Sequence, residues 1–341
     1  MAAPNLVGLD IGSSSIRAAE TSRGKEGPTI TGFGHVALPA GAVQAGVVQD
    51  DRAVTQAIKE LWSTAKIRNR RVLLGVNNPQ VVVREMTVQN LPMAQLRASL
   101  PFQVRDALPL AVERSVLDFY PLEDAGHNET VRGLLVAAPK DAVLAAVRAT
   151  ERAGLHVARV DLASFALVRS VSQLDVPAEA LVDLGARSTI VVVHAGGVPV
   201  IVRTIPRGGA EITEAVAARR DVTQTEAEAL KCRTGLIDTE DPDTADAVRE
   251  AVRPIISEIR SSFAYLTAGD RQTRVSRLVL SGGGALLPGL VDALATQLGV
   301  ETVLAEPTIR VREARGTKTA RLDRMRSAAT VSIGLALGAA A

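Results

Sequence analysis

Two short segments combine an aspartate, a glycine and small polar residues at the end of an apolar run. They are LVGLDIGSSSIR at 6–17 and ALVDLGARSTIV at 180–191. A tight turn rich in Gly and Ser exposes backbone N–H groups, and a concavity of such groups attracts phosphate oxygens. A carboxylate at the end of each strand can hold a hydrated Mg²⁺ through its waters. Together the two segments predict a site for a nucleoside triphosphate and its metal ion.

The two segments are separated by about half the chain. Asp10 and Asp183 lie 173 residues apart in a chain of 341. Two similar halves that face each other across a cleft would bring both strand ends to one point. A third segment, RLVLSGGGALLPGL at 277–290, has the pattern of a buried strand that ends in three glycines and opens a helix. Backbone without side chains lets a flat ring or a phosphate lie directly on it, and no Lys-Ser/Thr follows as in the Walker motif.

Strand and helix patterns alternate along the whole chain, which is typical of an α/β fold. The first part contains a helix pattern at 51–66 and strand patterns at 5–11, from Ile16, at 29–38, 70–76 and 81–88. A compact unit that we expect to be an inserted subdomain follows, with helices at 93–107 and 140–153 and strands at 115–122 and 130–138. The later part has a strand at 156–160, a helix from Asp161, a hairpin at 188–205 turned by Gly196-Gly197, helices over 208–269, a strand at 276–281 and a last helix at 323–339.

The composition excludes several classes of protein. Hydrophobic residues make up 47% of the chain and charged residues 22%, so the chain can bury a sizeable core. A single cysteine, Cys232, excludes a disulfide framework, and four scattered histidines do not reach metal-ligand spacing. The sequence lacks a signal-peptide pattern and an apolar run of about 18 residues, so we expect a soluble cytoplasmic protein. The basic segment 310–326 has no aromatic platform beside it, which disfavours nucleic-acid binding.

The ordered set LDIGSSSIR, VDLGARST and LSGGGALLPG resembles the phosphate-1, phosphate-2 and adenosine motifs of the actin/Hsp70/hexokinase superfamily. Within it the chain is most similar to the PilM family, the actin-like ATPase family of type IV pilus assembly, which is related to FtsA. The resemblance implies duplicated ribonuclease-H-like domains around a nucleotide cleft, with an FtsA-like inserted 1C subdomain. It implies the following division: 1–88 as the first half of domain 1, 89–155 as subdomain 1C, 156–180 as the return to domain 1 with the interdomain helix, 181–322 as domain 2, and 323–341 as a C-terminal helix that packs back on domain 1.

The resemblance also assigns roles to single residues. ATP would contact the hairpins and loops at Asp10, Gly12, Ser13, Ser14, Ser15, Arg17, Asp183, Gly185, Ser188, Gly209, Glu228, Lys231, Gly282, Gly283 and Gly284. Asp10 and Asp183 would hold Mg²⁺ through water. Glu228 and Lys231 would contact the ribose or adenine, although a surface ion pair explains their spacing equally well.

Hydrolysis is expected to be slow or absent. Asp161 matches the position where hydrolysing relatives orient the attacking water, but an aspartate between a strand and a helix is also an ordinary N-cap. Ala186 stands where actin has a second carboxylate, which removes one water-orienting group.

Three of the eight aromatic residues, Phe102, Phe119 and Tyr120, fall in the expected insert. They form either its core or a groove for a partner peptide. The resemblance implies that the partner is the cytoplasmic tail of a PilN-like inner-membrane protein, and that the chain reaches the inner face of the membrane through this partner rather than by a span of its own. Pilus motor ATPases and a second copy of the chain stay open as further partners. An FtsA-like division protein and a small-molecule kinase of the same superfamily are the alternative functions.

Overall fold

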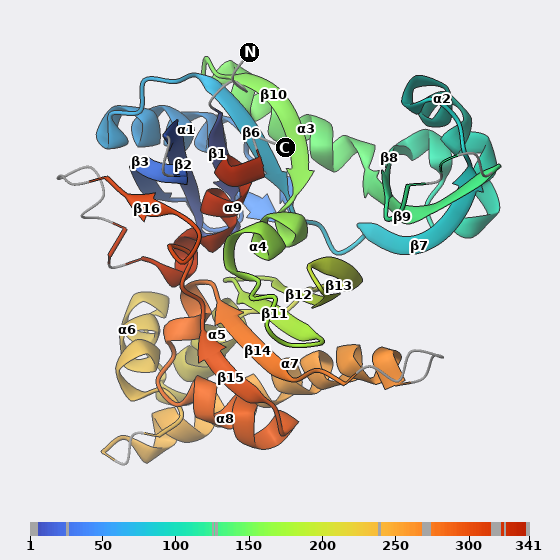
Figure 1. The fold of residues 1–341 in the computed structure, drawn as a ribbon. Coiled ribbons are helices and arrows are strands. Elements are labelled where there is room, and N and C mark those ends of the chain that lie inside the picture. The colour runs from blue at the N-terminus through green and yellow to red at the C-terminus, as the bar shows by residue number, and fades with distance from the viewer. Residues whose placement is uncertain are drawn as a thin grey trace.

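The computed structural model describes residues 6–24, 27–124, 126, 129–237, 240–267, 274–314, 322–323 and 325–338. Parts of some expected segments lie outside these ranges, namely residue 5, residues 268–269, residues 315–321 and 324 of the basic segment, and residues 339–341. Within the described residues, two large sheets alternate with layers of helices, and a smaller sheet stands off to one side (Figure 1).

The first large sheet has six strands. Across the sheet they are β10 (His156–Leu162), β6 (Arg71–Val76), β1 (Val7–Ile11), β2 (Ser15–Gly24), β3 (Gly27–Ala37) and β16 (Arg312–Glu313). β1, β2 and β3 are antiparallel neighbours, whereas β6 runs parallel to β1 and β10 runs parallel to β6.

The second large sheet repeats this connectivity with five strands. Across the sheet they are β13 (Val198–Ile205), β12 (Thr189–Ala195), β11 (Glu179–Leu184), β14 (Arg277–Ser281) and β15 (Glu301–Leu304). β11, β12 and β13 are antiparallel neighbours, β14 is parallel to β11, and β15 is parallel to β14. As expected, Gly196 and Gly197 turn the β12–β13 hairpin, with positive φ angles of 58° and 85°. The duplication predicted from the two aspartates is therefore confirmed in the order and direction of the strands.

Amphipathic helices cover the outer faces of both sheets. On the first sheet, α1 (Asp51–Ala65) starts at Asp50, whose carboxylate accepts a hydrogen bond from the Ala53 N–H, and buries Val54, Ile58 and Leu61 against β1 and β2. α3 (Lys140–Arg152) packs beside it. The second sheet is covered by α5 (Gly209–Arg220), α7 (Pro242–Thr267) and α8 (Leu290–Leu298), and α6 (Gln224–Thr234) packs on α5 and α7.

Two short helices, α4 (Ala163–Val171) and α9 (Thr330–Gly338), lie between the sheets and join them (Figure 1). Leu167 of α4 and Leu335 of α9 share one buried cluster with residues from strands of both sheets. A Cβ on Gly334 would lie 1.9 Å from the carbonyl oxygen of Ala166, so only glycine allows this approach of the two helices. The halves are thus connected through a closely packed layer of apolar side chains.

The third sheet has the order β7 (Val82–Gln89), β9 (Thr130–Pro139) and β8 (Ser115–Pro121), with α2 (Met93–Gln103) against it. Its core includes Leu96 and Leu100 from α2 and Leu135 from β9. This unit projects from the body in Figure 1, and β7 also lies against β13 of the second half. Two short strands, β4 (Val43–Gln44) and β5 (Val47–Val48), form a separate ribbon near the end of β6.

Several expected boundaries differ from the structure. The expected insert begins at residue 89, but β7 pairs with β9 and so already belongs to the third sheet. α3 falls within the expected insert, but it packs on α1 of the first half. The alternating pattern of a strand does not tell which sheet it joins, and the five-part division stays a prediction. β10 continues to Leu162, so α4 begins at Ala163 rather than at Asp161. The last helix begins with a 3-10 turn at Ser327–Ala329, after the expected residue 323. In the described residues no helix combines the length and apolar character needed to cross a bilayer.

Candidate functional site: a cleft between two matched hairpins

The first hairpin joins β1 to β2 through Gly12, Ser13 and Ser14. The Gly12 N–H donates to the Ser15 carbonyl at 3.0 Å, which closes the turn. Asp10 and Arg17 are cross-strand partners, and Arg17 Nη1 donates to Asp10 Oδ2 at 3.2 Å. The predicted residues of this motif are therefore brought together, except that Ser15 is buried and serves the turn through its carbonyl.

The second hairpin joins β11 to β12 with the same geometry. The Gly185 N–H donates to the Ser188 carbonyl at 3.0 Å, in the position of the Gly12–Ser15 bond. Asp183 stands where Asp10 stands, and its Oδ1 accepts a hydrogen bond from Ser281 Oγ at 2.7 Å. The backbone hydrogen bond that closes the turn is thus the same in both segments, whereas the side-chain partners of the two aspartates differ.

Both hairpins line one cleft that is open to solvent. Its walls include these predicted residues: Asp10, Gly12, Ser13, Ser14, Arg17, Asp183, Gly185 and Ser188. The strand ends of the two halves therefore meet at one point, as the half-chain spacing predicts.

Burial in the cleft makes ionisation of the Asp10 and Asp183 carboxyl groups less favourable. Burial raises the pKa of Asp10, and the charge and hydrogen bond of Arg17 offset this only in part. Burial raises the pKa of Asp183 to about 6; Ser281 lowers it in part and the Asp10 charge raises it further. A divalent cation between the two aspartates would stabilise their ionised forms.

The donor set fits a phosphate chain with a hydrated magnesium ion. Arg17 Nε is buried and has no hydrogen-bond partner within the described residues, so an anion could use it. No group of three or more His, Cys, Asp or Glu side chains in the described parts of the chain could hold a metal ion. Two carboxylates alone suit Mg²⁺ that keeps most of its water shell.

Glu228, Lys231 and Gly209 do not line the cleft but connect to its second hairpin. The Gly209 N–H donates to the Gly185 carbonyl at 2.9 Å. Lys231 is buried, and its Nζ donates to the Gly209 carbonyl at 3.2 Å and to Glu228 Oε2 at 2.6 Å. Burial opposes ionisation of Glu228, yet hydrogen bonds from Lys231 and Thr213 hold its pKa below the usual value. The pair is therefore anchored to α5.

The three glycines after β14 also stand outside the lining of the cleft, beside the end of β11. Gly282 has a φ of 89°, and a Cβ there would lie 2.4 Å from the Leu184 carbonyl oxygen. Gly283 has open space around its Cβ position. Gly284 is tight against the Leu184 side chain. The loop presents bare backbone next to Asp183, which is the feature that its sequence predicts.

Asp161 is not brought to the cleft. It lies in β10 and makes a short ion pair with Arg169 of α4, whose Nε donates to the Gly334 carbonyl at 3.0 Å. The interpretation of Asp161 as an N-cap is wrong, because the cap residue of α4 is Leu162. At the start of α4 the cleft is lined by Ala163, which offers only a methyl group.

Asn77 is a cleft residue that the sequence analysis does not identify. It follows β6 in the first half, and its Nδ2 donates to Ser188 Oγ in the second half at 3.1 Å. Its Oδ1 accepts a hydrogen bond from Thr204 Oγ1 at 2.9 Å. The sequence marks 77–79 only as a turn, since these partners are 111 and 127 residues away.

The three aromatic residues of the unit formed by the third sheet and α2 divide between its core and its surface. Phe119 is only 3% exposed and packs in the core of this unit, whereas Phe102 is 77% exposed and Tyr120 is 61% exposed. Phe119 and Tyr120 are consecutive on β8, so they point to opposite faces. The structure thus places one of the three in the core and leaves the other two accessible.

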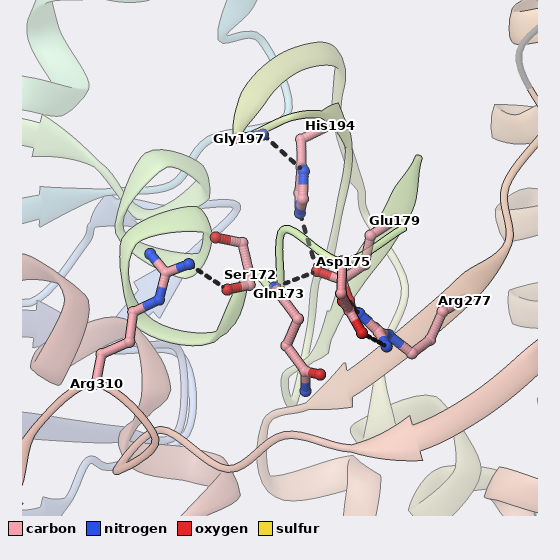
Figure 2. A network of polar contacts seen from close by, with 8 residues as sticks. All are labelled: Ser172, Gln173, Asp175, Glu179, His194, Gly197, Arg277 and Arg310. Carbon is pink, nitrogen blue, oxygen red and sulfur yellow. Dashed lines mark hydrogen bonds and ion pairs between the residues drawn. The ribbon is translucent and has the colours of Figure 1, made fainter. Parts of the chain in front are cut away.

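A second polar cluster lies at the opposite end of β11 from the cleft (Figure 2). Glu179 is fully buried there and accepts from Arg277 Nε at 2.7 Å and from the Gln173 N–H at 2.8 Å. His194 Nδ1 accepts from the Gly197 N–H, so its proton sits on Nε2 and is donated to Glu179 at 3.0 Å. Burial would raise the pKa of Glu179, but these hydrogen bonds hold it below the usual value.

This cluster ties the linker after α4 to the second sheet. Arg277 also pairs with Asp175 of the linker, and Arg310 donates to the Ser172 carbonyl at the end of α4 (Figure 2). Every charged member drawn has a partner, so the cluster holds structure and offers no open site.

The duplicated sheets, the two helices between them and the paired hairpins together define an actin-like fold. MreB5 of Spiroplasma citri bound to ADP has this fold, with a TM-score of 0.53 and 12% identity over 96% of this chain and 94% of that one.

A family model described as type IV pilus assembly protein PilM matches residues 8–340, and the chain belongs to this family. A solved PilM–PilN type IV pilus biogenesis complex contains a chain with a TM-score of 0.86 and 28% identity, over 99% of both chains. The cell division protein FtsA of Bacillus subtilis (strain 168) is 24% identical over an alignment of 353 positions. The alignment covers 88% of this chain and 78% of FtsA.

Proposed function

We propose that the chain is a nucleotide-dependent scaffold of type IV pilus assembly, which binds ATP and Mg²⁺ in the cleft and recruits an inner-membrane partner through the third sheet. The observation that carries the proposal is the pair of matched hairpins whose aspartates meet in one cleft. Membership of the PilM family and the high similarity to a chain of a PilM–PilN complex support the pilus role over cell division.

In this proposal each part of the cleft has a role. The N–H groups and hydroxyls of the two hairpins and the Arg17 guanidinium would bind the phosphates, and Asp10 and Asp183 would accept hydrogen bonds from the water shell of Mg²⁺. Bound Mg²⁺ supplies charge neutralisation for the phosphates. The glycine loop at 282–284 and the Glu228–Lys231 pair would contact the adenosine, because both stand beside the second hairpin.

Slow or absent turnover is part of the proposal. Ala163 and Ala186 line the cleft with methyl groups, so neither can orient an attacking water. Asp161 is engaged by Arg169 and is a weak candidate for that role. A long-lived bound nucleotide suits a scaffold whose state must outlast the encounter with its partner.

The proposed partner is the cytoplasmic tail of a PilN-like inner-membrane protein, which would hold the chain at the inner face of the membrane. Phe102 is exposed on α2 and Tyr120 is exposed on β8, and both would contact the tail, while Phe119 would support the sheet from its core. Pilus motor ATPases and a second copy of the chain are further partners to be tested by the same titrations.

Nucleotide binding is tested by thermal unfolding with and without ATP and Mg²⁺. Ligand at 100 times its Kd should raise the melting temperature by roughly 4 °C. Asp183→Asn should lose the magnesium-dependent part of this shift, while Asp292→Asn, an exposed carboxylate on α8, should keep it. An unchanged melting temperature of the wild-type protein at millimolar MgATP would contradict the proposal.

Partner binding is tested by titrating a labelled peptide of the PilN-like tail. Phe102→Ala and Tyr120→Ala should weaken binding, whereas Ile237→Ala, an equally exposed apolar residue of the second half, should not. If both insert variants keep their melting temperature and bind as the wild type does, the peptide binds elsewhere.

A further inference from the structure

Thr204, Asn77 and Ser188 form a hydrogen-bonded chain between the two halves, which we call the clasp. Thr204 Oγ1 donates to Asn77 Oδ1 at 2.9 Å, and Asn77 Nδ2 donates to Ser188 Oγ at 3.1 Å. Asn77 belongs to the first half, while Ser188 belongs to the β11–β12 turn and Thr204 to β13 of the second half. The clasp therefore crosses the cleft at one place.

The clasp fixes which way the Ser188 hydroxyl can act. In the structure the amide oxygen of Asn77 faces Thr204 and its amide nitrogen faces Ser188, so the Ser188 hydroxyl accepts from the amide. This nitrogen fills one acceptor site of the Ser188 hydroxyl and leaves its proton for another acceptor. Ser188 lines the cleft beside the second hairpin turn, so an anionic oxygen in the cleft is a suitable acceptor.

Two members of the clasp, Asn77 and Thr204, connect to the third sheet. On one side Asn77 precedes the short connection 78–81 to β7, which is held by hydrogen bonds from the Asn78 side chain to the Ala45 carbonyl and from the Gln80 N–H to Asn78. On the other side Thr204 lies on β13, which packs against β7. Ser188 is therefore linked to β7 by two paths of contacts, one through Asn77 and the other through Thr204 and β13.

We infer that the clasp couples occupancy of the cleft by a nucleoside triphosphate to the third sheet, so that the bound anion tightens β7 through Ser188, Asn77 and Thr204. The inference deepens the proposed function and rests on it, because it names the residues by which the nucleotide would act on the partner-binding unit. Hydrogen bonds in a chain polarise and strengthen one another, so a charged acceptor at one end strengthens the whole chain. Coupling of this kind is reciprocal, and a partner that tightens β7 would also tighten nucleotide binding.

The test compares Thr204→Val, which has nearly the same shape but no hydroxyl, with Thr204→Ser, which keeps the hydroxyl. Thr204 does not line the cleft, so both variants keep its walls. Amide hydrogen exchange in β7 and β9 is measured without ligand and at saturating MgATP. We expect MgATP to slow exchange in β7 at least about threefold in the wild type and in Thr204→Ser, but not in Thr204→Val. The ATP affinity of Thr204→Val should fall about threefold to tenfold, the size of one ordinary hydrogen bond.

Each other result overturns the inference. A wild-type response in Thr204→Val, or a lost response in Thr204→Ser, would show that the hydroxyl does not carry the coupling. A wild type whose melting temperature rises with MgATP but whose β7 exchange is unchanged would refute the coupling and leave nucleotide binding intact. The absence of any thermal shift would refute nucleotide binding itself and the coupling with it. If Thr204→Val does not fold, Thr204→Ala, which also removes the hydroxyl and leaves the walls of the cleft unchanged, carries the same expectation.

Discussion

Replacing Asp183 by asparagine should make the ligand-free protein more stable at neutral pH. The carboxylate lies at the end of β11, where burial raises its pKa from 3.8 to about 6, although the hydrogen bond from Ser281 counteracts part of this and the charge of Asp10 adds to it. The ionised side chain therefore opposes folding at pH 7.5. Asparagine is neutral and keeps a carbonyl oxygen that can accept the hydrogen bond from Ser281 Oγ.

The size of the gain follows from the pKa difference. A rise from 3.8 to about 6 corresponds to about 3 kcal/mol at pH 7.5. Asp183 keeps partial contact with solvent, so we expect the free energy of unfolding to rise by about 1–3 kcal/mol. Between these two pKa values the folded state binds more protons than the unfolded chain, so wild-type stability falls as the pH rises through this window. The advantage of Asp183→Asn should therefore shrink by about half at pH 5.

The assay is urea unfolding in the presence of a chelator at pH 7.5 and pH 5. Asp292→Asn, exposed on α8, is the matched control and should change the free energy of unfolding by less than about 0.5 kcal/mol at both pH values. The reasoning would be refuted if Asp183→Asn were no more stable than the wild type at pH 7.5, or if its advantage were the same at both pH values.

Three other substitutions test the remaining geometry. Arg277→Ala should lower the free energy of unfolding by about 3–5 kcal/mol in urea, because it leaves Glu179 charged and fully buried. Gly46→Ala should destabilise the protein by more than about 2 kcal/mol in a thermal scan, because φ is 73° there and the added Cβ would lie 1.7 Å from a carbonyl oxygen. Gly196→Ala should cost only about 1 kcal/mol in the same scan, because it has a similar φ but open space around the Cβ. Asp161→Ala should leave the single-turnover rate of ATP hydrolysis unchanged, at no more than about one per minute.

Each of these has a result that contradicts it. Arg219→Ala removes an exposed pair with Glu250 and should cost under about 1 kcal/mol, so an equal loss in both arginine variants would deny the burial argument. Equal losses in the two glycine variants would deny the close approach at Gly46. A drop in hydrolysis for Asp161→Ala would place this side chain at the cleft after all.

Local patterns allowed the hairpins to be predicted, because a turn and its flanking strands lie within a dozen residues. Asp10 with Gly12 and Asp183 with Gly185 therefore stand where the sequence puts them. Asn77 could not be found this way, since its contacts depend on how the two halves are placed relative to each other. The same reason explains β7, whose pattern indicates a strand but not its partner.

At the start of α4 a two-residue error in the predicted boundary changes which residue meets the cleft. An acidic residue at the end of a strand pattern suggests an N-cap, but β10 runs on through Leu162 and the cleft meets Ala163. For the aromatic residues, the period of two along a strand already shows that Phe119 and Tyr120 cannot share a face. Which of them is buried depends on where α2 packs, and this is a tertiary property.

The position of α9 determines when the first half can fold during synthesis. This helix covers the inner face of the first sheet, yet its residues follow the last of the sheet's main strands by about 170 positions. At a translation rate of roughly 5–20 residues per second, that face stays uncovered for roughly 10–30 s after β10 has emerged. The half that is made first is therefore completed last, and a ribosome that stalls before residue 330 leaves an apolar sheet face for chaperones to cover.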